Sequence, residues 1–498
     1  MTYGRPGVYI NERLLPAPIA TTGSANAAGA VVGKFAQGPT AVTLVTSWYD
    51  FVKKFGGYDV VNPATFGVGM FFQNGGGELY VRRILHSDAT AATVSIPRGV
   101  GSGNVATVTA KNAGTDGNNL RVQVTAAALA DHYTLTVYKE TVAGTSGDVS
   151  NDLVLEQFTN VVFNDVTSSD FVSTVVGYSS TQISITVTDV VNAPSTAVLP
   201  LTSGSNGTTP TAADYTNALS DFTAVDRPLV LFAPEITALL GATDAATIHD
   251  GLISWASTYN GFAVIDTDVN LSVSDALTYA SARQASSNAA VYYPPVFVSD
   301  PLGRSAQALR KVGPAGAIAG LYLDTDRQYG PFKAPAGIRA SIRGAVALEK
   351  AFTAAELDSL NSGAAPINAL RNLPGAGIVA MGARTLKQDG TANRYVNMRR
   401  SLIYIKKQLN DLTQFALFEN NDEVLWARLR TAIGVFLNDY RNQGGLRGTP
   451  ATAYFVKVDA ENNTDATIAN GEVHIEVGVA LEYPAEFVVI NLSQKTAA

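Results

Sequence analysis

The sequence contains no cysteine, and this absence excludes disulfide bonds, thiolate nucleophiles and zinc sites with cysteine ligands. Histidine is also scarce: the chain has four, and no two of them have the spacing of a metal-binding pair. A phosphate-binding glycine loop and a Gly-x-Ser-x-Gly nucleophile elbow are both missing. The sequence therefore predicts no catalytic residue, no metal site and no bound cofactor.

Charged residues are the second shortage. Asp, Glu, Lys and Arg make up 15% of the 498 residues, against about 25% in typical soluble proteins. A chain with so little charge has little solvated surface, which fits either a subunit covered by its neighbours or a large monomer with Thr- and Ser-rich strands. The net charge of −7 offers no globally basic surface to nucleic acid, and no apolar run has the length of a membrane span. Because a signal-peptide pattern is also missing, neither direct nucleic-acid binding nor membrane insertion is expected.

The N-terminal segment, residues 1–25, lacks the composition of a compact domain. Val8, Tyr9 and Ile10 form a strand-like stretch, and two prolines beyond it exclude a helix or a central strand. Fully extended, about 22 residues reach roughly 70 Å, which is far enough to contact a neighbouring molecule. The segment is therefore either an arm that exchanges between molecules or an ordinary floppy terminus.

The stretch after Pro484 predicts a second arm at the other end of the chain. Its apolar residues are Phe487, Val488, Val489, Ile490 and Leu492. An apolar terminal strand has unpaired backbone groups and is an aggregation hazard unless a sheet receives it. We therefore expect a partner sheet for this strand.

Two segments between the arms have the pattern of an α/β fold. Residues 26–87 combine buried strands with short helices, and residues 204–390 alternate strands with helices. In the second segment the expected strands are 228–233, 261–266 and 290–293, and the expected helices are 244–258 and 274–287. This order predicts a mixed sheet covered by helices.

The intervening residues, 88–203, are dominated by Thr, Val, Ser and Ala in short alternating runs, which are typical of an all-β module. Because buried strands occur on both sides of it, this module is expected to be an insertion into one core. Residues 86–205 contain four Lys or Arg and ten Asp or Glu, a net charge of about −6. Such an excess predicts an exposed, outward-facing surface.

The C-terminal third predicts two helices followed by two strands. One helix begins near residue 397, and a second over 422–441 has its apolar residues at a 3.6-residue period: Leu425, Leu429, Ala432, Ile433, Phe436, Leu437 and Tyr440. Strands are expected at 454–459 and 473–481. Residues 394–447 contain nine Lys or Arg and five Asp or Glu, so this part is basic within an acidic chain. The basic residues form either a solvated helix face or a docking face for an acidic partner.

Two acidic motifs suggest chemistry but fit it poorly. Residues 266–270 begin like a calcium loop, yet the sixth position is Leu271 rather than Gly and the twelfth is not Glu. Asp324 and Asp326 are close enough in sequence to offer paired carboxylates for acid–base work. Because an arginine follows them directly, an ion pair in a loop is the simpler interpretation.

Several short motifs near both ends of the chain form one recognisable set. The N-terminal motifs are Pro6–Glu12, Val32-Gly33 with Gly38-Pro39, Phe55-Gly56-Gly57 and Phe71–Gly76. The C-terminal motifs are Asn397–Arg400, Phe418–Asn421 with Trp426, Gly444–Gly448, Asn462–Thr464 and Pro484–Phe487. In order along roughly residues 1–85 and 390–494, they resemble the sheath family of contractile bacteriophage tails and phage-derived injection devices. Met398 departs from the family pattern, which carries Val more often.

This resemblance implies a structural protein and no enzyme. Sheath subunits stack as six-fold rings around an inner tail tube, and their terminal arms add strands to sheets of neighbouring subunits. On triggering, the subunits move as rigid bodies into a shorter and wider helix while the arms keep the assembly connected. The contraction drives the tube through the host envelope for genome delivery. The implied partners are further copies of the chain, the tube protein, and baseplate and tail terminator proteins, within a virion tail assembled in the host cytoplasm.

The resemblance also suggests roles for particular residues. The strand-like stretches at 8–10 and 487–492 are the candidate intersubunit arms, and Arg428, Arg430 and Arg441 are candidates for facing the tube. The expected divisions are an arm (1–25), a first core part (26–87), the inserted β domain (88–203), a middle α/β part (204–390), a C-terminal sheath domain (391–484) and a second arm (485–498). A virion-associated adhesin or a glycan hydrolase built on the β module is the alternative.

Overall fold

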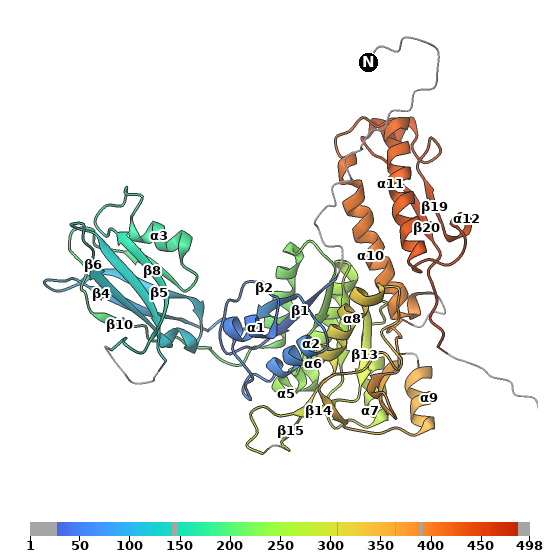
Figure 1. Cartoon of the computed structure of the whole chain (residues 1–498), viewed down its shortest axis with the longest axis horizontal. Helices are drawn as coiled ribbons and strands as arrows, with labels where there is room; N and C mark the ends of the chain where they lie inside the picture. The colour runs from blue at the N-terminus through green and yellow to red at the C-terminus, as the bar shows by residue number, and fades with distance from the viewer. Residues whose placement is uncertain (1–26, 142–147, 306, 364, 388–391, 487–498) are drawn as a thin grey trace, which may run out of the picture.

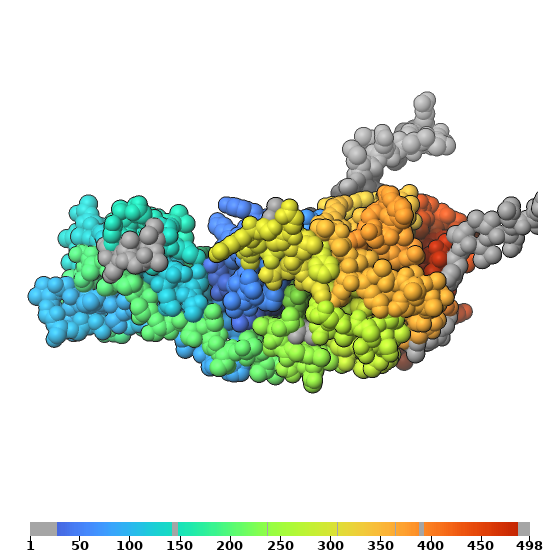
Figure 2. All heavy atoms as spheres, turned by 90° about the horizontal axis from the view of Figure 1, so that it is seen from below, coloured from blue at the N-terminus to red at the C-terminus, as the bar shows by residue number. Residues whose placement is uncertain are grey.

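The computed structural model describes residues 27–486 except 142–147, 306, 364 and 388–391. The molecule is elongated, with a β-rich module at one end, an α/β body in the middle and the C-terminal helices at the other end (Figures 1 and 2). Within the described ranges, no helix has both the length and the apolar character needed to cross a membrane.

An eight-stranded sheet forms the centre of the body, with its strands in the order β18-β17-β13-β12-β11-β1-β3-β2. Their bounds are β1 Ala28–Gly33, β2 Thr43–Val45, β3 Leu79–Arg83, β11 Leu229–Phe232, β12 Phe262–Asp266, β13 Ala289–Tyr293, β17 Ile367–Leu373 and β18 Gly377–Ala380. The inner strands are parallel, whereas β2 and β18 pair antiparallel at the two edges. The predicted mixed α/β core is therefore confirmed.

Helices cover both faces of this sheet because its inner strands are apolar on both sides. Along β11, Val230 and Phe232 join the core on one face, and Leu229 and Leu231 join the core on the other. The first face is covered by α1 Trp48–Phe55, α2 Ala64–Gln73 and α8 Ala315–Tyr329. The second is covered by α4 Ala212–Ala218, α5 Ile236–Leu240, α6 Ala242–Thr258, α7 Val273–Ser281 and α9 Ala354–Ser362. A small sheet of β14 Val296–Ser299, β15 Leu309–Val312 and β16 Ala345–Leu348 completes the body.

Helices α2 and α8 cross at contact distance on the first face of the sheet. A Cβ atom on Gly316 would lie 2.0 Å from the carbonyl oxygen of Gly67, and one on Gly320 would lie 2.3 Å from that of Phe71. Only glycine lets the two backbones approach so closely. This crossing fixes the position of α8, whose far end reaches the C-terminal helices.

The module between β3 and β11 contains two antiparallel sheets, with strand orders β10-β6-β7-β8 and β4-β5-β9. The strands are β4 Ala91–Pro97, β5 Asn104–Ala113, β6 Leu120–Ala126, β7 Tyr133–Lys139, β8 Leu153–Val161, β9 Ile183–Val187 and β10 Val198–Pro200. The module has an apolar core of its own, to which Val108, Val122 and Val137 belong. It also contains a helix, α3 Val172–Ser179, so the expectation of strands alone missed one element. Whether the module folds separately stays a prediction.

Arg83 joins this module to the body. The side chain is fully buried at the end of β3 and donates hydrogen bonds to the carbonyl oxygens of Phe35 and Gly38 in the body, at 3.0 and 2.8 Å. On the module side it donates to the carbonyl of Ala113 at 2.7 Å and to Asn206 Oδ1 at 3.2 Å. Burial lowers the pKa of Arg83 to about 10, which leaves the guanidinium charged at neutral pH.

Three local expectations differ from the structure. The helix expected over 274–287 ends at Ser281, and the Ser286 hydroxyl beyond it accepts from the Asn288 N–H at 3.0 Å, a local bond that competes with a helix. The strand expected over 473–481 is limited to Glu476–Val479. It does not begin earlier because the Asn463 side chain forms hydrogen bonds with both the N–H and the carbonyl oxygen of His474. The segment around Asp324 and Asp326 lies in α8 rather than in a loop.

Candidate assembly surface around the C-terminal helices

Two long helices form the frame of the C-terminal region. They are α10 Val396–Thr413 and α11 Glu423–Asn442, which stand side by side in Figure 1. The Asp422 carboxylate caps α11 by accepting from the Leu425 N–H at 2.9 Å. Of the apolar positions predicted for α11, Leu425, Leu429, Ile433, Leu437 and Tyr440 are buried, whereas Ala432 and Phe436 are half-buried. Met398 and Ile405 of α10 join Ile433, Leu437 and Tyr440 in one apolar cluster, so the two helices pack as a pair.

A two-stranded sheet packs against α11. It consists of β19 Tyr454–Lys457 and β20 Glu476–Val479, with the short helices α12 Pro450–Ala453 and α13 Asp465–Ala469 beside it. Within the described part of the chain, the outer edge of β19 has no strand partner, and beside β20 there is only an isolated bridge between Leu446 and Leu481. Phe455 of β19 is 52% exposed. Two strands alone are marginally stable, and this sheet has open edges that can receive another strand.

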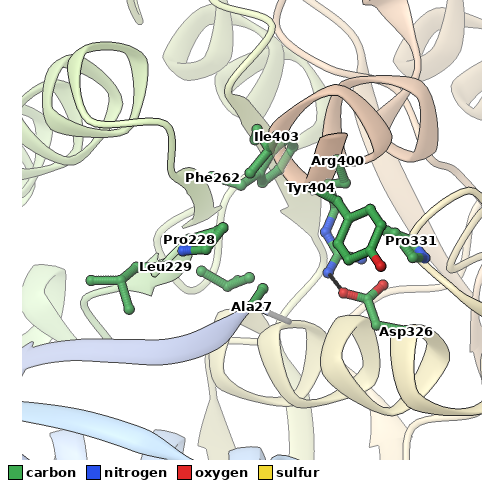
Figure 3. A pocket seen from close by; sticks show the side chains of 10 residues that line it. Ala27, Pro228, Leu229, Phe262, Asp326, Pro331, Arg400, Ile403 and Tyr404 are labelled. Carbon is green, nitrogen blue, oxygen red and sulfur yellow. Dashed lines mark hydrogen bonds and ion pairs between the residues drawn. The ribbon is translucent and has the colours of Figure 1, made fainter. Parts of the chain in front are cut away.

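The α10 helix is tied to the body by a buried ion pair. The Arg400 guanidinium pairs with the Asp326 carboxylate of α8 and lies 4.6 Å over the ring of Tyr322. Both meet at the wall of a small cavity of about 20 Å³ that is also lined by Tyr404 and Ala27 (Figure 3). Burial raises the pKa of Asp326, and the charge of Arg400 acts in the opposite direction. Because a broken pair would leave an uncompensated buried charge, this contact holds α10 on α8.

A second cation of α10 is also engaged inside the chain. Lys407 is 7% exposed at its side chain and pairs with Asp226 at 3.0 Å and with Asp411 at 2.6 Å. The basic residues of the C-terminal third therefore do not all form one solvated or docking face. Arg400 and Lys407 instead fix α10 to the rest of the molecule.

The three candidate tube-facing arginines lie on two sides of α11. Arg428 is exposed, 5.0 Å over the Phe415 ring and 3.9 Å from Glu419. Arg430 donates to the carbonyl of Val458 at 2.6 Å, and Arg441 donates to Asn438 and Asn442. At about 100° per residue, Arg430 and Arg441 share one side of the helix, and Arg428 lies on the other.

The first described residue lies against α10, and the last lies beside Tyr395, which directly precedes that helix. Ala27, the first described residue, lines the cavity beside Arg400 and Tyr404. Glu486, the last, is held by Arg384 through Nε at 2.7 Å and Nη2 at 2.6 Å. The predicted arm residues Val8, Tyr9, Ile10, Phe487, Val488, Val489, Ile490 and Leu492 lie outside the described residues. The arms themselves remain a prediction, but the segments that precede and follow them are placed.

The two acidic motifs do not assemble an active site. Asp324 pairs with Arg327 and, at 3.3 Å, with Arg343, so neither carboxylate of the proposed acid–base pair is free. Among the described residues, no group of three or more His, Asp or Glu side chains has an arrangement that would hold a metal ion. Sequence reasoning did miss one feature here: Asp266 meets Glu235 in the core. An acidic residue that ends a strongly apolar strand would have been the signal for it.

The C-terminal part of the chain, residues 388–495, matches the family model described as the phage tail sheath C-terminal domain. The tail sheath protein of Vibrio phage KVP40 is 30% identical over 178 residues, which is 36% of this chain and 26% of that protein. The matched region is thus about a quarter of the length of this curated relative. The resemblance to the sheath family that the sequence motifs indicated is confirmed.

Solved sheath structures share the fold over almost the whole chain. The helical sheath of the anti-feeding prophage in its contracted state aligns with a TM-score of 0.60 at 22% identity, covering 99% of this chain and all of the other. The contracted sheath complex of the extracellular contractile injection system PVC gives 0.59 at 21%, covering 99% of each chain. The sheath tail protein of Listeria innocua gives 0.61 at 14%, covering 92% of this chain and 95% of the other.

Proposed function

We propose that this chain is the structural subunit of a contractile tail sheath. It polymerises as six-fold rings around an inner tube and contracts to drive the tube through the host envelope for genome delivery. The observation that carries this proposal is the two-stranded sheet of β19 and β20, which packs against α11 and whose β19 edge has no strand partner among the described residues. An open edge beside apolar residues is the surface that exchanged arms of neighbouring subunits would need.

In this proposal, the arms of neighbouring subunits add strands to the sheet of β19 and β20. Main-chain hydrogen bonds along an open edge supply affinity, and side chains such as Val8, Ile10, Val488 and Ile490 would cover apolar residues of the acceptor. Phe455 and the partly buried Val477 and Val479 offer such a surface. The arms leave beside α10, whose ion pairs with α8 and Asp226 transmit load to the body. Connections of this kind allow rigid subunits to move while the assembly stays linked.

The remaining partners follow from the same proposal. The tube protein contacts one side of α11 through Arg428, or the other through Arg430 and Arg441. Baseplate and tail terminator proteins meet the first and last rings, and the assembled chain is part of a virion tail that forms in the host cytoplasm. The relatives are structural proteins, and Asp324 and Asp326 are held in ion pairs, which supports a structural role over a hydrolase.

Removing residues 1–20 tests the strand exchange. We expect a folded monomer with the melting temperature of the parent, because the described body begins at Ala27, and no tubes in negative-stain electron microscopy. A matched control exchanges the exposed Val435 of α11, which lies outside both the deleted residues and the strands β19 and β20, for Ser and should leave tube formation intact. Tubes of normal length from the truncated protein would contradict the proposal.

A further inference from the structure

Two carboxyl groups meet at the start of α8, away from the assembly surface. Glu235 follows β11 and Asp266 ends β12, so both lie at the carboxyl ends of neighbouring parallel strands. Glu235 Oε1 accepts from the Gly313 N–H at 2.7 Å, and Asp266 Oδ1 accepts from the Ala315 N–H at 2.5 Å. Both acids therefore bind backbone groups at the beginning of one helix.

The cavity around these carboxyls is small, and some of the polar atoms beside it have no hydrogen-bond partner among the described atoms. A Cβ atom on Gly313 would lie 2.3 Å from Asp266 Oδ2, so the Asp266 carboxyl reaches the residue that Glu235 binds. Asp266 is 6% exposed and Thr267 is 3% exposed. Asp266 Oδ2 and the Thr267 hydroxyl have no hydrogen-bond partner among the described atoms. These residues and Glu235 line a cavity of about 20 Å³, which has room for one water molecule.

The charges around the pair oppose its proton only in part. The charge of Arg310 in β15 lowers the pKa of Glu235, but this guanidinium is also paired with Asp300 at 3.1 Å, and the larger effect of burial still raises that pKa. His249 of α6 bonds the Tyr279 hydroxyl of α7 at 2.5 Å, and burial lowers its pKa to about 3, which keeps the imidazole neutral. Asp268, which follows β12, adds another negative charge near Glu235.

The start of α8 stabilises one negative charge, but a second negative charge beside it is unfavourable. The N–H groups and dipole at the start of α8 stabilise a single carboxylate. Two carboxylates that share a buried site cannot both ionise at low cost. Accordingly, burial raises the pKa of Glu235 to about 7, and burial together with the Glu235 charge raises the pKa of Asp266 well above its usual value. Glu235 is also held at a φ of +60°, a strained conformation for a residue other than glycine.

We propose that Glu235 and Asp266 form a proton-binding site, in which one proton is shared between the two carboxyls and one water occupies the cavity. A metal ion fits the site less well: Asp268 and His249 also line the cavity, but among the described residues no three His, Asp or Glu side chains are arranged to hold a metal ion. Release of the proton at alkaline pH places a second charge at the start of α8. That helix carries Asp326, the partner of Arg400, so the proton stabilises the element to which α10 is tied. The inference holds whether or not the chain forms a sheath.

The pH dependence of stability tests the site. In the native state the pair holds a proton that the unfolded chain loses above the ordinary carboxyl pKa of about 4.3. The contribution of this pair to the free energy of unfolding is therefore fully present below that pKa and is lost as pH rises toward 7. The ratio of folded to unfolded protein should fall by up to about tenfold per pH unit in this window. Glu235→Gln should remove that part of the slope, and Asp170→Asn, on the exposed surface of the module, should retain it.

Infrared spectroscopy of the parent protein gives a direct measurement that does not depend on a variant folding. At pH 6 exposed carboxyls are ionised, so a protonated C=O band should identify the buried pair. The band should disappear as pH rises to 9 and should be reduced or shifted in Glu235→Gln. Absence of the band at pH 6, or equal pH slopes for the parent and Glu235→Gln, would overturn the proposal. Stabilisation at pH 8 by added calcium or magnesium, lost in Glu235→Gln, would also overturn it in favour of a metal site.

Discussion

Three buried cations hold the larger parts of this molecule together. Arg83 bonds carbonyls of both the body and the inserted module. Arg400 pairs with Asp326 to fix α10 on α8, and Lys407 joins the same helix to Asp226. Directional hydrogen bonds at such positions fix an orientation, which apolar contact alone does not provide.

Replacing Arg83 by Met should loosen the joint between module and body. Four carbonyl oxygens, of Phe35, Ala36, Gly38 and Ala113, would lose their donor. At about 1–3 kcal/mol for each buried group left unpaired, the free energy of unfolding should fall by at least about 3 kcal/mol. Limited proteolysis should then cut faster near residues 86–90 and 203–208.

The neighbouring Arg82→Met is the matched control for that change. Arg82 pairs with the half-exposed Asp221 at 2.6 Å and donates to the Arg83 carbonyl at 2.5 Å, so its replacement leaves one carbonyl oxygen without this donor rather than four. A partly exposed ion pair contributes about 0–1 kcal/mol. Its melting temperature and cleavage pattern should stay close to those of the parent. Equal behaviour of the two variants would mean that Arg83 is not the joint.

At the scale of elements, local patterns in the sequence predicted a strand or helix correctly where a single pattern, an apolar run or a helical period, was present. The apolar runs of β1, β11 and β12 and the 3.6-residue period of α11 predicted these elements. Where side chains compete with the backbone the predictions were wrong, as in the overlong helix that ends at Ser281 and the overlong strand opposed by Asn463. The side-chain hydrogen bonds that end these two elements depend on individual residues, and the periodicity of apolar residues does not show them.

The crossing of α2 and α8 gives a prediction about a single element contact. In Gly316→Ala, the new Cβ would lie 2.0 Å from the backbone oxygen of Gly67, so one helix must move. Overpacking of this kind costs about 1–3 kcal/mol, and the melting temperature should fall accordingly. Gly434→Ala in α11 is the control, because nothing lies within 4 Å of its added Cβ. Alanine is a better helix former than glycine by about 1 kcal/mol, so Gly434→Ala should be more stable than the parent. A lower melting temperature in both variants would refute the steric explanation.

At the scale of the whole molecule, sequence reasoning found the resemblance to the sheath family but not the internal connections. The motifs near both ends indicated a sheath protein, and the family model matches residues 388–495. The basic C-terminal third, however, was interpreted as one solvated or docking face. Arg400 and Lys407 are instead paired with Asp326 and Asp226, which lie far from them in the sequence. Such partners are set by the tertiary fold, so charge counting along the chain could not reveal them.

The arrangement of arginines on α11 sharpens the prediction about tube binding. Because Arg428 lies opposite Arg430 and Arg441, one side of the helix can face a tube and the other cannot. We expect Arg428→Glu to weaken sheath assembly on isolated tubes, since its guanidinium is exposed and free of backbone bonds. Each charged contact contributes about 0–1 kcal/mol, but repetition around a ring would add up to a firm and releasable grip.

Arg441→Glu is the comparison for the opposite side, because Arg430→Glu would also break the bond to the Val458 carbonyl and disturb β19. Co-sedimentation with tubes at low and high salt measures the effect, and high salt should reproduce the loss in the parent, since exposed charges are screened. Tube-free polymerisation should be unchanged in both variants. A loss confined to Arg441→Glu would place the tube on the other side of α11. If both variants bind tubes as well as the parent at low salt, α11 is not the docking helix, and the grip must come from another surface of the subunit.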